Sequence, residues 1–201
     1  GAILVIGYRY IPVDLILGKA DLKYSYYDLA IDKFKLLLKR DTGNVEVRVY
    51  LGLAYGKSKD YQKALNEFQW LKAEGRAPWL SAQAYNGKGE IYYVLEMYEQ
   101  AISDFKKAIE INKGFKEAYF NLACALSASG QRENAVAAYK KVLTLEPNNG
   151  YAHRNLALAL DKAGDAAEAA QHWKKYIEYV SRSSGATTLS KGESGRKTRK
   201  E

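Results

Sequence analysis

Two neighbouring segments decide the fold: Lys116–Asn149, which reads KEAYFNLACALSASGQRENAVAAYKKVLTLEPNN, and Gly150–Ser183, which reads GYAHRNLALALDKAGDAAEAAQHWKKYIEYVSRS. When Gly130 is aligned with Gly164, both segments carry Leu-Ala, Leu, Gly, Ala and a large aromatic residue at matching offsets. A period of about 34 residues is typical of stacked helix-turn-helix units. The two segments therefore predict a helical repeat.

The same register continues upstream through residues 82–115, 45–81 and 11–44, and the middle of these is longer by a few residues around Gly75 and Pro78. Small residues at two positions would let the two helices of a hairpin approach closely. Aromatic side chains, each able to bury on the order of 150 Å² or more, would fill the space between hairpins. One hairpin cannot bury this face alone, so neighbouring hairpins must stack. The small residues are Gly18, Gly52, Gly89, Ala123 and Ala157 on the first helix, and Ala30, Ala64, Ala101, Ala135 and Ala169 on the second; the aromatic residues are Phe34, Phe68, Phe105, Tyr139 and Trp173.

This pattern resembles the tetratricopeptide repeat family, whose signature is Leu-Gly in the first helix, a Gly-aromatic turn, Ala opening the second helix, then an aromatic residue, Ala and Pro. Departures exist, because Lys88 stands in place of the expected Leu, Glu96 and Ser25 replace the turn Gly, and Pro147 alone keeps the terminal proline. The resemblance implies an all-α fold, a right-handed superhelical solenoid of antiparallel helix hairpins. Its five predicted repeats are 11–44, 45–81, 82–115, 116–149 and 150–183.

The two ends of the chain differ from the repeats. Residues 1–10 begin with the apolar run Gly1-Ala-Ile-Leu-Val-Ile-Gly7, which is far short of the roughly 20 residues that span a membrane. We interpret this segment either as a cap on the first repeat or as the remnant of a membrane anchor or signal. Residues 184–201 are polar, basic and rich in Gly and Ser, so we predict a flexible tail there.

The resemblance implies a concave wall built from the first helices, where members of the family bind protein segments. Asn121 and Asn155, one repeat apart, would either grip the backbone of an extended peptide or bond neighbouring hairpins. Phe120 and Tyr151 would be either apolar anchors on that wall or core residues. The candidate partner-binding residues are Tyr50, Lys57, Asn86, Glu90, Tyr93, Glu117, Phe120, Asn121, Tyr151, Arg154, Asn155 and Lys162, and Cys124 falls on the same wall.

The carboxylate clamp that some relatives use for chaperone C-termini needs Lys and Asn on one first helix, Asn on the next, then Lys and Arg on a third. The corresponding positions here read Val49, Leu53, Gly87, Glu117 and Asn121, and the frame that starts one repeat later does not fit either. We therefore predict no chaperone-tail recognition of that kind.

Patterns for catalysis, metals and cofactors are weak. The segment 52–58, GLAYGKS, looks like a phosphate-binding loop, but it lacks one residue between the glycines and falls inside a predicted helix. His153 and His172 fall on different helices with no carboxylate or thiol at ligand spacing, and Cys124 is the only cysteine. We predict that the chain is not an enzyme and needs no cofactor or metal.

The formal net charge is +8, and the stretch from Arg182 to Glu201 holds six Lys or Arg residues against two Glu. Contact with nucleic acid is therefore expected only weakly, through this basic tail. We predict a non-catalytic scaffold that binds a protein partner on its concave face, as an extended peptide, a helix or subunits of a larger complex. The alternative is a self-assembling structural protein, a homo-oligomer or coat joined through the solenoid ends. Localisation stays open between cytoplasmic and membrane-associated, the latter through residues preceding Gly1.

Overall fold

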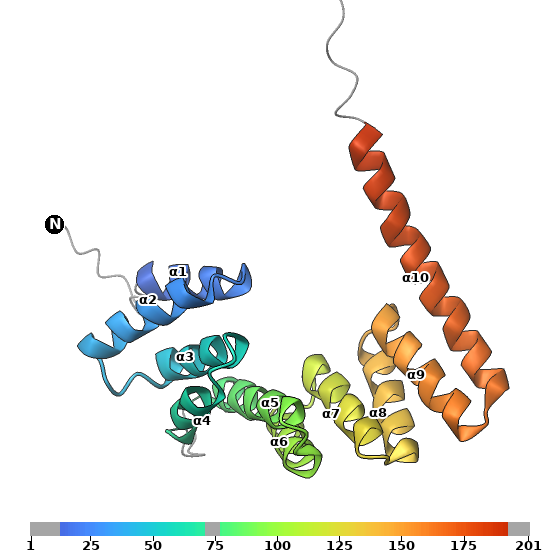
Figure 1. The fold of residues 1–201 in the computed structure, drawn as a ribbon, viewed down its shortest axis with the longest axis horizontal. Helices are drawn as coiled ribbons and strands as arrows, with labels where there is room; N and C mark the ends of the chain where they lie inside the picture. Colours follow the sequence, from blue (N-terminus) through green and yellow to red (C-terminus); the bar gives the residue numbers. More distant parts are fainter. Residues whose placement is uncertain (1–12, 71–76, 193–201) are drawn as a thin grey trace, which may run out of the picture. The chain divides into compact units, whose positions relative to one another are not determined.

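The computed structural model describes residues 13–70 and 77–192, and every regular element in these ranges is an α-helix (Figure 1). The predicted all-α repeat fold is confirmed, whereas the apolar segment 1–10 lies outside the described residues. The helices are α1 (Val13–Lys23), α2 (Tyr27–Arg40), α3 (Val45–Lys57), α4 (Tyr61–Gln69), α5 (Pro78–Val94), α6 (Tyr98–Ile111), α7 (Lys116–Ala128), α8 (Arg132–Leu145), α9 (Gly150–Ala163) and α10 (Ala166–Gly192).

The chain divides into two compact units, Gly1–Lys113 with helices α1 to α6 and Gly114–Glu201 with helices α7 to α10. In the first unit, α1 pairs with α2, α3 with α4 and α5 with α6, and α3 also packs against α2 and α5. In the second unit, α7 pairs with α8 and α9 with α10, and α8 packs against α9. Each unit is therefore a stack of helical hairpins.

Small residues lie directly under aromatic rings, as the sequence predicts. A Cβ atom on Gly52 of α3 would lie only 2.6 Å from Cε1 of Phe68 on α4, so any larger residue would force the two helices apart. The ring of Phe68 also reaches Gly87 in the next hairpin, which lets one aromatic side chain join two repeats. The matching alanines of the second unit, Ala123 and Ala157, are fully buried. In the first unit the close pairs are Gly18 with Phe34, Gly52 with Phe68, and Gly89 with Phe105.

All five hairpins turn in the same way, including the three that lack glycine. One residue of each turn takes a positive φ, and the residue after it donates its N–H to a carbonyl oxygen of the preceding helix at 2.8 to 3.0 Å. This pattern ends a helix by satisfying its last carbonyl groups. Side chains with a Cβ are strained at positive φ, which makes three of these turns less favourable than the other two. The residues and φ values are Ser25 (67°), Lys59 (68°), Glu96 (58°), Gly130 (82°) and Gly164 (88°).

Two first helices begin with an asparagine cap. The side-chain oxygen of Asn44 accepts a hydrogen bond from the backbone N–H of Val47 at 3.1 Å, and that of Asn149 accepts one from Ala152 at 2.9 Å. Each cap satisfies an N–H group that the helix itself leaves without a partner. The loops that contain these residues therefore fix where α3 and α9 start.

Lys88, which departs from the family pattern, has a buried partner. Its Nζ lies 3.2 Å from Oδ2 of Asp104 on α6, and the side chain of Asp104 is only 6% exposed. Lys107 reaches the other carboxylate oxygen at 3.8 Å. The lysine at this position therefore supplies the closer of two counter-charges to a buried aspartate.

Helix α10 continues through Gly192, well into the segment 184–201 for which the sequence predicts a flexible tail. Once a helix is nucleated, each added residue closes one more backbone hydrogen bond, so extension needs little further stabilisation. Composition alone does not capture this effect. Residues 193–201 lie outside the described part of the chain.

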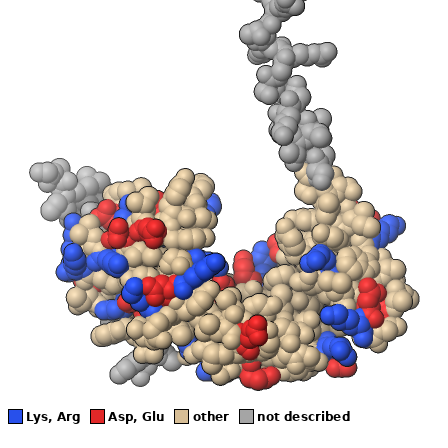
Figure 2. Space-filling model, in the orientation of Figure 1, with Lys and Arg blue, Asp and Glu red and all other residues tan. Residues whose placement is uncertain are grey.

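Charged side chains of both signs are interspersed on the face drawn in Figure 2. Several of them form ion pairs between helices, such as Lys19 with Glu46 at 2.6 Å and Lys140 with Glu168 at 2.8 Å. Among the helices of the described ranges, none combines the length and the apolar composition needed to cross a bilayer.

Candidate functional site

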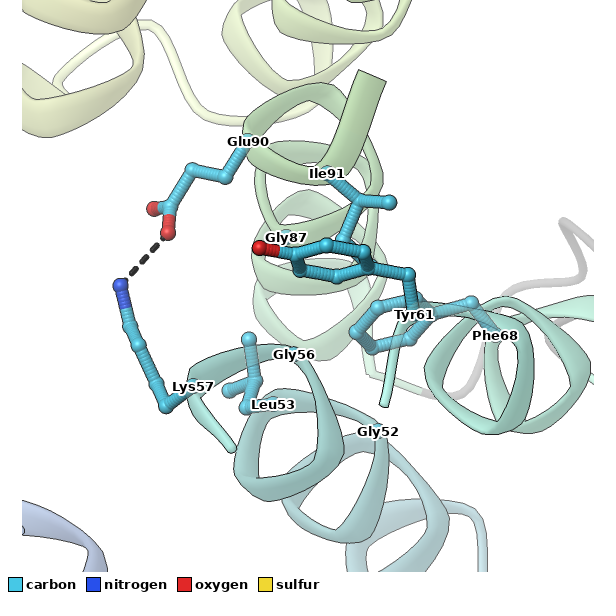
Figure 3. A pocket seen from close by; sticks show the side chains of 9 residues that line it. All are labelled: Gly52, Leu53, Gly56, Lys57, Tyr61, Phe68, Gly87, Glu90 and Ile91. Atoms are coloured by element: carbon cyan, nitrogen blue, oxygen red, sulfur yellow. Dashed lines mark hydrogen bonds and ion pairs between the residues drawn. The ribbon is translucent and has the colours of Figure 1, made fainter. Parts of the chain in front are cut away.

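Three of the predicted wall residues come together in the first unit. Lys57 ends α3, and its Nζ lies 2.7 Å from Oε2 of Glu90 on α5 (Figure 3). The other oxygen of Glu90 accepts a hydrogen bond from Nδ2 of Asn86 at 2.8 Å. These three side chains therefore form a polar chain, Lys57–Glu90–Asn86, that links the first helices of two successive repeats.

A small pocket lies beside this polar chain, between α3, α4 and α5 (Figure 3). Its volume is about 60 Å³, enough for a few water molecules, since one water needs roughly 10–15 Å³ of such space. A short aliphatic side chain would fit the same space. The pocket is lined by Gly52, Leu53, Gly56, Lys57, Tyr61, Phe68, Gly87, Glu90 and Ile91.

The glycines that line the pocket have different roles. Gly52 and Gly87 are packed against Phe68 and Leu53, so a Cβ atom at either position would clash. At Gly56 the nearest atom to an added Cβ would be Cδ1 of Ile91 at 3.7 Å, an ordinary contact distance. Position 56 is therefore the place in this pocket lining where a Cβ atom can be added without a clash.

The other two predicted wall residues of the first unit do not line this pocket. The ring of Tyr50 stacks on Phe34 with ring centroids 6.0 Å apart, and Nζ of Lys19 lies 4.4 Å from the centroid of Tyr50. Tyr93 lies next to Tyr98 with ring centroids 5.8 Å apart. Tyr50 thus contributes to packing between the first two hairpins, and Tyr93 to the end of α5.

In the second unit, Cys124 of α7 is the centre of another cluster. Its Sγ accepts a hydrogen bond from the hydroxyl group of Tyr139 at 3.3 Å and a longer one from Nδ2 of Asn155 at 3.9 Å. The ring of Phe120 meets that of Tyr139 edge to face, with ring centroids 6.0 Å apart. Phe120 and Asn155 are half-buried. Phe120 packs within the α7–α8 hairpin, whereas Asn155 links α9 to α7 of the preceding hairpin. Asn121, predicted to act with Asn155, is also half-buried.

Burial raises the pKa of the Cys124 thiol, and the hydrogen bonds from Tyr139 and Asn155 oppose this effect only in part. A thiol with a raised pKa is a poor nucleophile, because the thiolate is the reactive form. The cysteine is therefore a packing residue of the wall.

The remaining predicted residues of the second unit are exposed. Tyr151 is 60% exposed, and its ring lies edge to face with Tyr179 of α10 at 5.9 Å between centroids. Glu117 lies on α7 and Arg154 and Lys162 on α9, and all three are also exposed. These charges and the tyrosine are available to a partner without any rearrangement.

The sequence did not reveal the contact between His153 and His172. Their Nδ1 atoms lie 2.8 Å apart, and Nε2 of His172 lies 3.7 Å from Oε1 of Glu168. The prediction that these histidines have no carboxylate at ligand spacing is therefore wrong for His172, because Glu168 lies four residues before it on α10. Within the described residues there is no cluster of three or more His, Cys, Asp or Glu side chains that could hold a metal ion.

Comparison with known families identifies the repeat. Models of the tetratricopeptide repeat match residues 82–115, 116–149 and 138–171. No curated protein matches the chain in sequence.

Solved structures of MamA are similar to the chain. A crystal structure of MamA has a TM-score of 0.72 and 25% sequence identity, over 88% of this chain and 99% of that chain. A structure of MamA MSR-1 has a TM-score of 0.66 and 28% identity, over 85% of this chain and 96% of that one. Residues 82–171 therefore consist of tetratricopeptide repeats, and the MamA structures share the fold over most of the chain.

Proposed function

We propose that the chain is a non-catalytic scaffold that holds a segment of a partner protein along its first helices and so supports the assembly of a larger complex. The observation that carries this proposal is the pocket of the first unit, with the Lys57–Glu90–Asn86 chain at its edge. A pocket of this size can take one side chain of a bound peptide, and such side-chain pockets give peptide-binding proteins their specificity.

The chemistry of this site fits a peptide. The side chain of Lys57 is 52% exposed and that of Glu90 is 34% exposed, so both ends of the ion pair meet solvent. An exposed ion pair contributes only about 0–1 kcal/mol, so a charged group of a partner can replace one member at small cost. A short aliphatic side chain would enter the pocket, and a neighbouring charge on the same peptide would bind to Lys57 or Glu90.

Peptides selected from a displayed random library against the full chain would test this proposal. We expect the selected peptides to lose at least tenfold in affinity when Gly56→Leu fills the pocket. A control variant, Lys63→Ala, changes an exposed lysine of α4 outside the pocket and should bind as the wild type does. Selection of no peptide, or equal binding by the Gly56→Leu variant, would count against the site.

A second candidate, self-assembly, is favoured by apolar residues at both described ends. Val13 and Leu17 of α1 are 62% and 45% exposed, whereas Val47 and Leu51, at the same positions one repeat later, are 1% and 2% exposed. On α10, Ile177 is 61% exposed. We propose that these faces join copies of the chain.

Light-scattering mass at increasing concentration would test the second candidate. We expect the wild-type mass to rise above the 22.6 kDa of one chain and the Ile177→Glu variant to stay near that value. A wild type that stays monomeric at every concentration would exclude assembly through these faces.

A further inference from the structure

A direct contact between two histidine rings joins α9 to α10. The Nδ1 atoms of His153 and His172 are 2.8 Å apart, and the ring centroids are 5.1 Å apart. The rings therefore meet nitrogen to nitrogen rather than face to face. A nitrogen–nitrogen distance of 2.8 Å requires one hydrogen between the atoms, with one ring donating and the other accepting.

The surroundings decide which ring donates. Nε2 of His153 lies 3.0 Å from the carbonyl oxygen of Pro147, and a carbonyl oxygen can only accept, so this nitrogen carries a hydrogen. In a neutral ring the other nitrogen, Nδ1 of His153, is then an acceptor. It follows that Nδ1–H of His172 is the donor and that Nε2 of His172 carries no hydrogen while both rings are neutral.

Both rings are shielded from water. His153 is 8% exposed, and the side chain of His172 is 18% exposed. Burial lowers the pKa of His172, and the neighbouring His153 lowers it further, whereas Glu168 acts in the opposite sense. Lys140 of α8 binds the carboxylate of Glu168 at 2.8 Å and so weakens its attraction for a proton on His172. The charged groups around the pair are thus Glu168 on α10 and Lys140 on α8.

We propose that the His153–His172 contact is an acid-sensitive latch, which holds α10 against α9 while the rings are neutral and releases it when they take up protons. A first proton can enter at Nε2 of His172 and leave the contact intact. A second proton would place hydrogens on both Nδ1 atoms and break it. The closed hairpin therefore binds fewer protons than the open one.

The sign of the effect follows from this proton count. Histidines of the opened hairpin titrate near their ordinary pKa of about 6.5, whereas the closed contact has no room for hydrogens on both Nδ1 atoms and so binds one proton fewer. The latch is fully effective above that pKa. Below it, the ratio of closed to open hairpin falls by about tenfold per pH unit for each extra proton that the open form binds. One extra proton shifts the closed-to-open ratio by about 25-fold between pH 7 and pH 5. Opening would separate α10 from α9, whose residues Leu156 and Ala157 are fully buried in the closed hairpin.

Hydrogen exchange of the full chain at pH 7 and pH 5 tests the latch. The protection of α9 and α10 amides, divided by that of α7 and α8 in the same sample, should fall by at least about 25-fold. In a His153→Gln/His172→Asn double variant, amide groups can replace both hydrogen bonds but do not titrate in this range, so the ratio should stay within about twofold. An unchanged ratio in the wild type, or the same fall in the double variant, would overturn the proposal.

A second readout does not depend on any variant. Nitrogen NMR of the wild type at pH 7.5 reports which ring nitrogen carries the hydrogen. The latch requires hydrogens on Nε2 of His153 and on Nδ1 of His172. Any other tautomer pair would contradict the latch.

Discussion

Helix α5 of the first unit and helices α7 and α9 of the second carry different residues at one repeat position. The position is Gly87 in α5 and asparagine in the other two, Asn121 and Asn155. In the first unit the glycine lines a pocket of about 60 Å³, whereas in the second unit the amide of Asn155 reaches Cys124. The same repeat position thus lines a pocket in one unit and carries a hydrogen-bonding amide in the other.

The largest expected effect on stability comes from replacing Lys88 with leucine, the residue that the tetratricopeptide pattern has at this position. Lys88→Leu would leave the buried carboxylate of Asp104 with only the more distant Lys107, so we expect a loss of about 2–3 kcal/mol in the free energy of unfolding. Urea unfolding measures this loss.

A matched double variant sharpens the test of that pair. Lys88→Leu with Asp104→Ala reproduces Leu122 and Ala138, the residues at the same positions in α7 and α8, where no charge is buried. We expect it to recover most of the lost stability. If the double variant is as unstable as Lys88→Leu alone, the loss of stability does not come from breaking the ion pair.

An intermediate effect on stability is expected when the asparagine of the second unit replaces Gly87 in the first unit. In Gly87→Asn, the new Cβ would lie 2.8 Å from Cδ2 of Leu53 and 2.9 Å from Cζ of Phe68. Overpacking of this kind costs about 1–3 kcal/mol, which a thermal unfolding curve detects. Gly56→Ala, at the open position of the same pocket, serves as the control and should not destabilise the protein. Equal destabilisation by both variants would mean that the two glycines do not differ as described.

The smallest expected effect concerns the hairpin turns. Lys59→Gly should stabilise the protein by about 1 kcal/mol, because glycine adopts positive φ without the strain of a Cβ. Gly130→Ala in the second unit, where φ is 82°, should destabilise it by a similar amount. If both changes shift the melting temperature in the same direction, strain at positive φ does not explain the difference between the two turns.

The sequence predicted the packing of the repeats better than the contacts of the site. Glycine under phenylalanine recurs with the period, so pairs such as Gly52 and Phe68 could be predicted from spacing. The mapped wall included Lys57 and Glu90, but their bond depends on how closely α3 and α5 approach, which spacing does not give.

The histidine contact was missed for a related reason. His172 occupies the position of Asp104, and both reach a polar residue on the first helix of their hairpin, whereas the matching residue of α8 is Ala138. A polar residue where another repeat has alanine is therefore a signal for a buried polar pair. The length of α10 had no comparable signal, because helix extension into a Gly/Ser-rich segment depends on the helix that precedes it.

The most direct test of the binding proposal is a titration of one selected peptide into the wild type and into a Lys57→Glu/Glu90→Lys variant. The exchange keeps the ion pair and the pocket but reverses the charges presented to the peptide. We predict unchanged thermal stability with a loss of at least tenfold in affinity, recovered when the charge on the peptide is reversed. Equal affinity for the wild type and the exchanged variant would contradict the account.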